Sequence, residues 1–206
     1  MAEIRDLAAT EVDRAAAVLA RAFTDDPLFA HVFPDVATRP GALRAVFTGV
    51  LRYGLRYGRV WTTAGGEGVA IRRLPGDVPT VWRRVLRAGL GAVPFRIGVA
   101  ATARLLRIAE ASEAAALRHM AEPFWYCQVL GVDPEHQGRG HGRRLTRHTF
   151  ALAERDGLAC YLETAHPRAR DIHERNGWTE IGQFRVAGLT LWSMRRLPGG
   201  DPISPP

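Results

Sequence analysis

The sequence predicts a single α/β domain, of the α+β kind, with a mixed central sheet of about six to seven strands flanked by helices. Residues 124–132, 140–156 and 159–164 alternate as strand, helix and strand, and a connection of that length joins parallel strands by a right-handed crossover. Residues 59–74 and 178–196 show the alternation and glycine turns of antiparallel hairpins. Parallel and antiparallel pairs together make the sheet mixed.

One short strand and three helices are expected in the N-terminal third. Thr10 and Asp13 resemble a capping box, which marks a helix start, and Asp26-Pro27 suits the first turn of a second, shorter helix. The third helix carries apolar residues at helical spacing along one face. The expected ranges are 4–7 for the strand, about 10–23 for the first helix and about 39–57 for the third.

A hairpin with its turn at Gly65-Gly66 leads into a loop and then a helical region. The helical pattern runs from 81 to about 120 with breaks near Pro94 and Ala111, and it is basic and amphipathic. We expect an insertion that packs over the substrate side; a helix lying on a membrane surface is the alternative. The expected ranges are 59–64 and 68–74 for the strands and 75–79 for the loop.

The C-terminal part is expected to close the sheet. A short helix covers 167–176 and stops at Gly177, because glycine favours helix ends. The alternating runs on either side of 186–188 form the last hairpin. We expect residues 1–197 to be one domain and 198–206 to be a disordered tail.

Composition excludes several kinds of chemistry. The 206-residue chain has a net charge of +7, and all 28 basic residues are arginine. Without lysine there is no Schiff base, no P-loop lysine and no lysine general base. The arginines are dispersed, and no RNA-binding aromatic motif or zinc-finger spacing accompanies them, so no nucleic-acid partner is expected.

Membrane, secretory and metal-binding signals are not found in the sequence. Arginines interrupt the most apolar region before it reaches the ~20 residues of a membrane span, and the first residues do not resemble a secretory signal. We therefore expect a cytoplasmic protein with no membrane partner. Cys127 and Cys160 lie in apolar strand-like runs and are expected to be buried reduced thiols, and the seven histidines form no metal triad.

Three alternate glycines follow the central strand and precede a helix. A strand that runs into Gly138, Gly140 and Gly142 exposes consecutive backbone N–H groups, and the helix points its positive dipole end at them. This predicts a phosphate-binding turn. It is not a P-loop, which needs a lysine, nor a dinucleotide fingerprint, which needs a glycine where Arg143 stands.

The pattern Gln137-x-x-Gly140-x-Gly142 after a strand resembles the acyl-coenzyme A loop of the GCN5-related N-acetyltransferase (GNAT) family. The order of elements is similar to that fold, and residues 162–178 resemble the family's later strand–helix–strand segment. The resemblance is strong from residue 124 to 178. Residues 22–35 resemble the branch that includes puromycin N-acetyltransferases.

The resemblance implies acetyl-CoA as co-substrate and a sheet splayed at the acyl-CoA site. Backbone groups of Leu130, Gly131 and Val132 would then bind the pantetheine arm as an added strand does. The turn would bind the pyrophosphate, with its arginines adding positive charge or, alternatively, facing water. The implied turn residues are Gln137, Gly138, Arg139, Gly140, His141, Gly142, Arg143 and Arg144.

The resemblance also implies direct attack of a neutral amine on the thioester, in a ternary complex. The family commonly places a proton-donating tyrosine where this chain has His173. His173 is predicted to protonate the departing thiolate; the alternative is that it only fills that space while Tyr126 or water supplies the proton. Glu163, in an otherwise apolar strand, is predicted to be the general base or else to form an ion pair with an arginine.

Asp25 and Asp26 are candidates for holding a cationic amine, although Asp26 also suits helix capping. Phe29, Phe33 and Trp125 are candidate acceptor-site walls, with the hydrophobic core as the alternative. The predicted function is transfer of an acetyl group from acetyl-CoA to a primary amine of a small molecule, by a monomer or homodimer. A non-catalytic acyl-CoA-binding regulatory module is the alternative, and arginine-mediated nucleic-acid binding a third.

Overall fold

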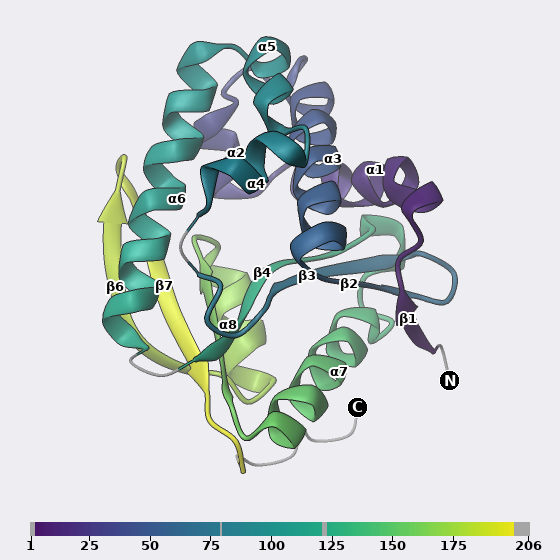
Figure 1. The fold of residues 1–206 in the computed structure, drawn as a ribbon, viewed down its shortest axis with the longest axis vertical. Coiled ribbons are helices and arrows are strands. Elements are labelled where there is room, and N and C mark those ends of the chain that lie inside the picture. The colour runs from purple at the N-terminus through teal and green to yellow at the C-terminus, as the bar shows by residue number, and fades with distance from the viewer. Residues whose placement is uncertain (1–2, 79, 121–122, 200–206) are drawn as a thin grey trace.

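The computed structural model describes residues 3–78, 80–120 and 123–199 and contains a seven-stranded mixed sheet with helices on both faces (Figure 1). The strand order is β1-β2-β3-β4-β5-β7-β6, and among these neighbours only β4 and β5 run parallel. The predicted fold class is confirmed. The strands are β1 (Ile4–Asp6), β2 (Gly58–Thr63), β3 (Gly68–Arg73), β4 (Phe124–Val132), β5 (Ala159–Thr164), β6 (Thr179–Val186) and β7 (Leu189–Arg196).

The helices divide between the two faces of the sheet. In Figure 1, α1 to α5 lie above β2 and β3, α6 runs alongside β6 and β7, and α7 lies below. α8 belongs with α7, because His173 of α8 and Phe150 of α7 both stack on Trp178. The helices are α1 (Val12–Ala22), α2 (Pro27–Val32), α3 (Arg39–Tyr57), α4 (Trp82–Arg87), α5 (Val93–Ile97), α6 (Val99–His119), α7 (His141–Asp156) and α8 (Pro167–Arg175), with 3₁₀ turns η1 (Ala9–Glu11), η2 (Leu90–Ala92) and η3 (Pro134–His136).

Two local expectations are wrong. The Thr10 capping box does not form: α1 begins at Val12, and Glu11 instead accepts a hydrogen bond from the Ala8 N–H at 3.1 Å. The break expected near Ala111 is also missing, since α6 runs unbroken from Val99 to His119. The sequence around Ala111 is rich in alanine and glutamate and holds no glycine or proline, so nothing there interrupts a helix.

The parallel pair β4–β5 is short, and the two strands then separate. Residues 124–126 pair with 159–161, after which β4 stays with β3 and β5 stays with β7. A bulge at Gln128 lies where the strands part, and Gln128 is exposed although the four residues before it are buried. We call the opening between 127–132 of β4 and 162–164 of β5 the fork. The predicted splay is therefore present.

Side chains at the fork alternate between two faces of the sheet. On one face, which we call the α7 face, Trp125, Cys127 and Cys160 pack with Leu145 of α7 and with Trp178. On the opposite face, the α6 face, Tyr126 and Tyr161 pack against Ala116 of α6 and Met120. The two faces consequently present different chemistry to anything bound in the fork. Both cysteines are buried and free, as predicted.

The basic insertion between β3 and β4 packs against α2, α3 and β6. Arg104 of α6 donates two hydrogen bonds to the Val32 carbonyl at the end of α2, at 2.8 and 3.1 Å. The outer surface of this insertion leaves apolar side chains exposed to solvent, and Phe95 is 92% exposed. No helix in the described part of the chain is long and apolar enough to span a membrane. Most of the predicted tail, residues 200–206, lies outside the described residues.

Candidate active site

The turn between β4 and α7 has a backbone suited to phosphate. Gly138 and Gly140 have φ angles of +77° and +79°, in the left-handed region that favours glycine. Gly140 directly precedes α7, and the first N–H groups of a helix have no partner within it. No backbone acceptor among the described residues meets the N–H groups of Gly138, Gly140 or Gly142. Together with the helix dipole, these groups form an anion-binding site of positive electrostatic potential.

Side chains of the turn mostly hold its shape. The Gln137 amide donates to the Val132 carbonyl at 3.2 Å, and Arg144 donates to the Arg139 carbonyl at 3.2 Å. Arg144 also lies 3.1 Å from Nδ1 of His141. Burial, and then the charge of Arg144, lowers the pKa of His141, so that ring is neutral at pH 7. Arg139 is exposed to solvent beside this anion-binding site.

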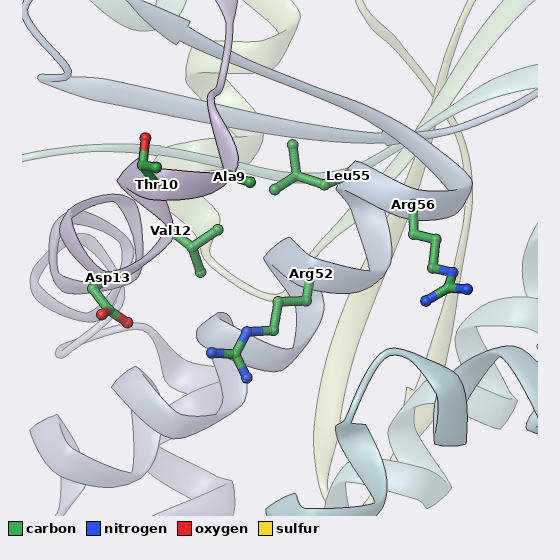
Figure 2. A pocket seen from close by; sticks show the side chains of 7 residues that line it. All are labelled: Ala9, Thr10, Val12, Asp13, Arg52, Leu55 and Arg56. Carbon is green, nitrogen blue, oxygen red and sulfur yellow. The ribbon is translucent and has the colours of Figure 1, made fainter.

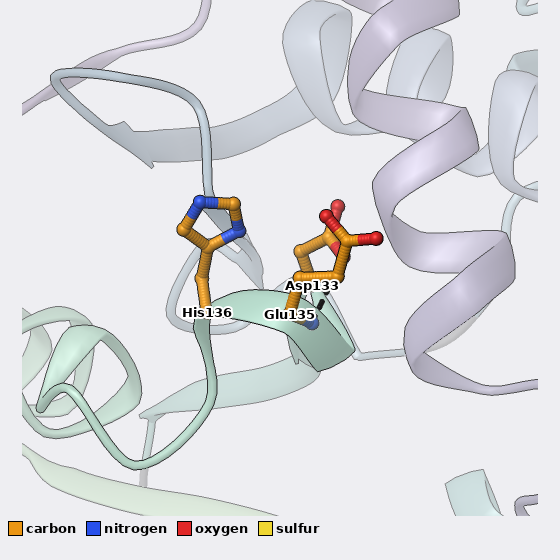
Figure 3. A group of neighbouring side chains, drawn as sticks. All are labelled: Asp133, Glu135 and His136. Atoms are coloured by element: carbon orange, nitrogen blue, oxygen red, sulfur yellow. Dashed lines mark hydrogen bonds between the residues drawn. The ribbon is translucent and has the colours of Figure 1, made fainter.

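The residues just before the turn include a group with possible metal ligands, shown in Figure 3: Asp133, Glu135 and His136, whose ligand atoms lie within 4.8 Å of one another. The Asp133 carboxylate already binds the guanidinium of Arg21 in α1 and accepts a hydrogen bond from the Glu135 N–H at 3.4 Å. The hydrogen bond from Arg21 lowers the pKa of Asp133. Arg21 thus supplies the positive charge that a cation would bring, and the group anchors α1 to the turn.

Glu163 and Tyr126 meet at the closed end of the fork, on the α6 face. The Tyr126 hydroxyl donates to Oε2 of Glu163 at 2.7 Å, while the buried Oε1 has no partner among the described residues. Burial raises the pKa of Glu163 to about 8, although the hydrogen bond from Tyr126 and the charge of Arg73 act in the opposite direction. Glu163 does not form the alternative ion pair: Arg73 pairs with Glu113 at 2.9 Å.

His173 lies on the other face, the α7 face. Its ring packs edge-on against Trp178, with centroids 6.0 Å apart. Burial, and next the positive charge of Arg72, lowers the pKa of His173 to about 4. The imidazole is therefore neutral at pH 7, which argues against the predicted proton-donor role.

The turn between α1 and α2 approaches the fork from the α6 face. Asp26 caps α2 by accepting from the Leu28 and Phe29 N–H groups at 3.0 and 3.4 Å, so the capping alternative is realised. Burial raises the pKa of Asp26, and the charge of His166, just after β5, acts against that shift. Asp26 thus faces the end of β5, while the neighbouring Asp25 is exposed.

The candidate aromatic residues separate into two places. Phe29 packs with Phe23 and Phe47, with centroids 5.5 and 5.3 Å apart, near Asp26. Phe33 is buried in the core at the end of α2. Trp125 lies on the α7 face, where its indole N–H donates to Asp156 at 3.1 Å, and the structure does not bring it to the α1–α2 turn. A tryptophan in a central strand is typical of core packing.

Sequence reasoning missed the positioning role of two residues, Arg39 and Gly131, although it placed Gly131 among the pantetheine-binding residues. Arg39 is buried and donates to the carbonyls of Thr24, Phe33 and Pro34, which fixes the junction of α1, α2 and α3. Gly131 lets α1 pack closely on β4, because a Cβ there would lie 2.8 Å from Leu19. An arginine in a helical pattern looks solvent-exposed, so only the glycine offered a signal.

Three surface hollows, formed by residues of α1, α2, α3, α5 and α6 and the turns next to them, lie away from the fork. Figure 2 shows one of about 330 Å³ between the start of α1 and the end of α3, lined by Thr10, Asp13, Arg52 and Arg56 among others. Its charged, open lining has no connection to Glu163 or to the glycine-rich turn. The candidate site is instead defined by unpaired backbone groups at the fork.

Part of the chain is similar in sequence to known acetyltransferases. Residues 97–180 match the family described as the acetyltransferase (GNAT) domain. An uncharacterised N-acetyltransferase of Schizosaccharomyces pombe is 27% identical over 178 residues, which cover 82% of this chain and 71% of the relative. The N-alpha-acetyltransferase RimI of Mycobacterium tuberculosis is 39% identical over 87 residues, which cover 39% of this chain and 53% of the relative.

A solved structure extends the likeness over nearly the whole fold. It is described as histone acetyltransferase HPA2 and related acetyltransferase from Corynebacterium glutamicum, with a TM-score of 0.71, 22% identity and coverage of 97% of this chain and 98% of that one. At this identity the likeness shows the fold alone. The match of residues 97–180 to the acetyltransferase (GNAT) domain covers less than half of the chain, and it agrees with the fold of this solved structure. The narrower likeness of residues 22–35 to puromycin N-acetyltransferases stays a prediction.

Proposed function

We propose that the protein transfers an acetyl group from acetyl-CoA to a primary amine of a small molecule. One observation carries the proposal: the fork has a phosphate-binding turn at its open end and a buried carboxyl group, Glu163, at its closed end. The first suits the pyrophosphate of a CoA thioester, and the second suits proton removal from an amine.

Binding is assigned mainly to backbone groups. The N–H groups from Gly138 to Gly142 are free of backbone acceptors at the turn and fit a pyrophosphate, with Arg139, Arg143 and Arg144 adding charge. The amides of a pantetheine arm fit the backbone of β4 in the part that no longer pairs with β5, at Leu130, Gly131 and Val132. A donor lying along β4 would bring its thioester toward Tyr126 and Glu163.

Glu163 is proposed as the general base. A carboxyl group with a pKa of about 8 holds a proton more strongly than an ordinary glutamate, and its ionised form is correspondingly a stronger base. Since only the ionised form accepts a proton, the rate is expected to rise with pH toward about 8. Tyr126 orients this carboxyl group through its hydrogen bond, and burial raises the pKa of Tyr126 as well, so the phenol remains a donor.

The reaction is proposed to proceed by direct attack. The amine nitrogen bonds to the acetyl carbon, the C–S bond breaks with its electron pair going to sulfur, and Glu163 takes the amine proton. A backbone N–H of β4 near the closed end of the fork, where β5 no longer pairs with β4, would hold the oxyanion that forms between these events. His173 is proposed to line the thiol end, because a ring with a pKa of about 4 is not an effective acid at pH 7.

The acceptor is proposed to enter beside the α1–α2 turn. Asp25 and Asp26 offer carboxyl groups there, and Phe29 offers an aromatic wall, whereas Phe33 and Trp125 serve the core. A cationic amine with an adjacent apolar group fits this combination. Because M. tuberculosis RimI is named as an N-alpha-acetyltransferase, a peptide N-terminus is the second acceptor class to test.

The test measures CoA binding by calorimetry and thiol release from acetyl-CoA with a panel of amines. Small amines, polyamines and short peptides with free N-termini form the panel. Thiol release with a small amine supports the proposal, and release only with peptides would replace the acceptor class. Binding of CoA without thiol release from any acceptor would favour the alternative of a non-catalytic binding module. Salt-sensitive binding of a nucleic-acid duplex, with no binding of CoA, would favour the nucleic-acid alternative.

A further inference from the structure

An arginine with no acidic partner lies buried beside the fork. Arg72 of β3 is 1% exposed, and no ion pair among the described residues includes it. Its guanidinium donates to Oγ1 of Thr149 at 3.0 Å and to the carbonyls of Ile71 and Val129 at 3.1 and 2.8 Å. These acceptors are neutral, and no aspartate or glutamate among the described residues pairs with the guanidinium.

A buried charge without a counter-charge is costly to the fold. Transfer of a charged group from water to the interior remains strongly unfavourable even after relaxation, and neutral hydrogen bonds offset only part of that cost. At this position Arg72 donates to Thr149 of α7 and to the Val129 carbonyl of β4, and a neutral donor could also satisfy these neutral acceptors. The charge itself is therefore the property to explain.

Arg72 lies near the closed end of the fork, toward which the donor's sulfur would be brought. Val129, whose carbonyl it binds, is in the part of β4 that β5 has left. Cys127, which lies beside the guanidinium, packs in the same α7-face cluster as Trp178, on which His173 stacks. His173 stands at the position of the family's proton-donating tyrosine.

We propose that the buried charge of Arg72 stabilises the negative charge that collects on the CoA sulfur as the C–S bond breaks. The proposal rests on the proposed acetyl transfer. Sulfur keeps the electron pair of the broken bond, Glu163 holds the amine proton, and the thiolate later takes a proton from water. The electric field of Arg72 then stabilises the leaving thiolate, a task that a proton-donating side chain performs in other enzymes, so no imidazolium is required.

The same field acts on every titratable group packed around Arg72. These groups are Cys127 of β4, Cys160 of β5, His148 of α7 and His173 of α8. Burial and then Arg72 lower the pKa of His173, whereas for His148 the charge of Asp6 intervenes and opposes the shift. The ring of His173 is thus a built-in reporter of the Arg72 charge in the protein without any ligand.

Two neutral variants, Arg72→Met and Arg72→Gln, and one charged variant, Arg72→Lys, test the proposal. Methionine fills the space of the arginine stem, and glutamine keeps a donor for the Val129 carbonyl, so the proposal remains testable if either folds. Removing an uncompensated buried charge is not expected to unfold the protein. Arg185→Met, on the exposed side of β6, removes the same charge elsewhere and serves as the control.

The first measurement is the pKa of His173 by NMR in the ligand-free variants. Both neutral variants are expected to raise it, and Arg72→Lys and Arg185→Met to leave it nearly unchanged. The second is the pH at which CoA bound to the protein becomes a thiolate, read from thiolate absorbance. A unit charge several ångströms away in a buried site changes such an ionisation by about tenfold or more, so loss of Arg72 should raise that pH by roughly one unit.

Turnover is expected to fall by about tenfold or more in the neutral variants, with CoA affinity retained. Unchanged thiol ionisation and turnover in a folded neutral variant that binds CoA would overturn the Arg72 proposal and leave the proposed function standing. A wild-type protein that binds no CoA would overturn both. Recovery of thiol ionisation and turnover in Arg72→Lys would support the role of charge over shape.

Discussion

The two faces of the fork carry buried titratable groups whose pKa values shift in opposite directions. On the α6 face, burial raises the pKa of Glu163 to about 8, and on the α7 face, burial and Arg72 lower the pKa of His173 to about 4. The physical cause is shared, because a dry environment disfavours the charged form of either group. Both side chains are consequently largely neutral at pH 7.

The difference between the faces assigns separate tasks. A neutral carboxyl group that ionises near pH 8 can take up and release protons near physiological pH, whereas an imidazole that ionises near pH 4 cannot donate one there. The α7 face holds a permanent charge in Arg72 instead. Under the two proposals, proton transfer belongs to the α6 face, and stabilisation of negative charge belongs to the α7 face.

Glu163→Gln gives the largest expected effect. The amide cannot accept the amine proton, so turnover should fall by ~10²-fold or more while CoA binding is retained. Steady-state kinetics with the best acceptor from the panel measure it. Glu110→Gln, an exposed glutamate on α6, is the matched control and should behave as wild type. Equal turnover in Glu163→Gln and wild type would end the assignment of the base.

Gly140→Val tests the turn that both faces depend on. A β-branched residue is strained at φ +79° and covers the N–H groups proposed to bind pyrophosphate, so CoA affinity should fall by about 10- to 100-fold. Gly157→Val, at φ +66° on the other end of α7, carries similar strain far from the turn. Calorimetry should show weak CoA binding only in Gly140→Val; the same loss in both would point to damage to the helix.

The pH dependence of the free energy of unfolding should distinguish Glu163 from an ordinary glutamate. The folded protein keeps the Glu163 proton up to a pKa of about 8, while the unfolded chain loses it near ~4.3, so wild-type stability falls as pH rises between these values. Glu163→Gln removes that dependence. Its stability relative to wild type should increase by a few kcal/mol from pH 5 to pH 8 in urea unfolding, and a constant difference would contradict the raised pKa.

His173→Phe is expected to have the smallest effect. If the imidazole is neutral and only lines the thiol end, turnover should fall less than about tenfold; a ~10²-fold loss with normal CoA affinity would restore the proton-donor role. The pKa of His173, lowered to about 4, also costs stability as pH falls from ~6.5 toward that value. In thermal unfolding, the phenylalanine variant should accordingly lose less stability than wild type when the pH is lowered to 5.

The sequence reveals the backbone part of the site more clearly than its charged part. Gly138 and Gly140 were predictable because few residues other than glycine adopt their conformation. Glu163 stood out as a carboxylate in an apolar strand.

Arg72 gave no such signal. In the sequence it is one of two adjacent arginines at a strand end, and its burial depends on the bulge in the neighbouring strand, a three-dimensional property. Likewise, the burial that keeps His173 neutral comes from packing against Trp178, and sequence spacing does not report it.

One NMR titration of the ligand-free protein, from pH 3 to 9.5 with labelled glutamate and histidine, tests the contrast between the two faces most directly. Resonances are assigned with Glu163→Gln and His173→Phe. We expect the Glu163 carboxyl carbon to titrate with a pKa of about 8 and the His173 ring with a pKa of about 4. Midpoints near the ordinary ~4.3 and ~6.5 would contradict the account of the two faces.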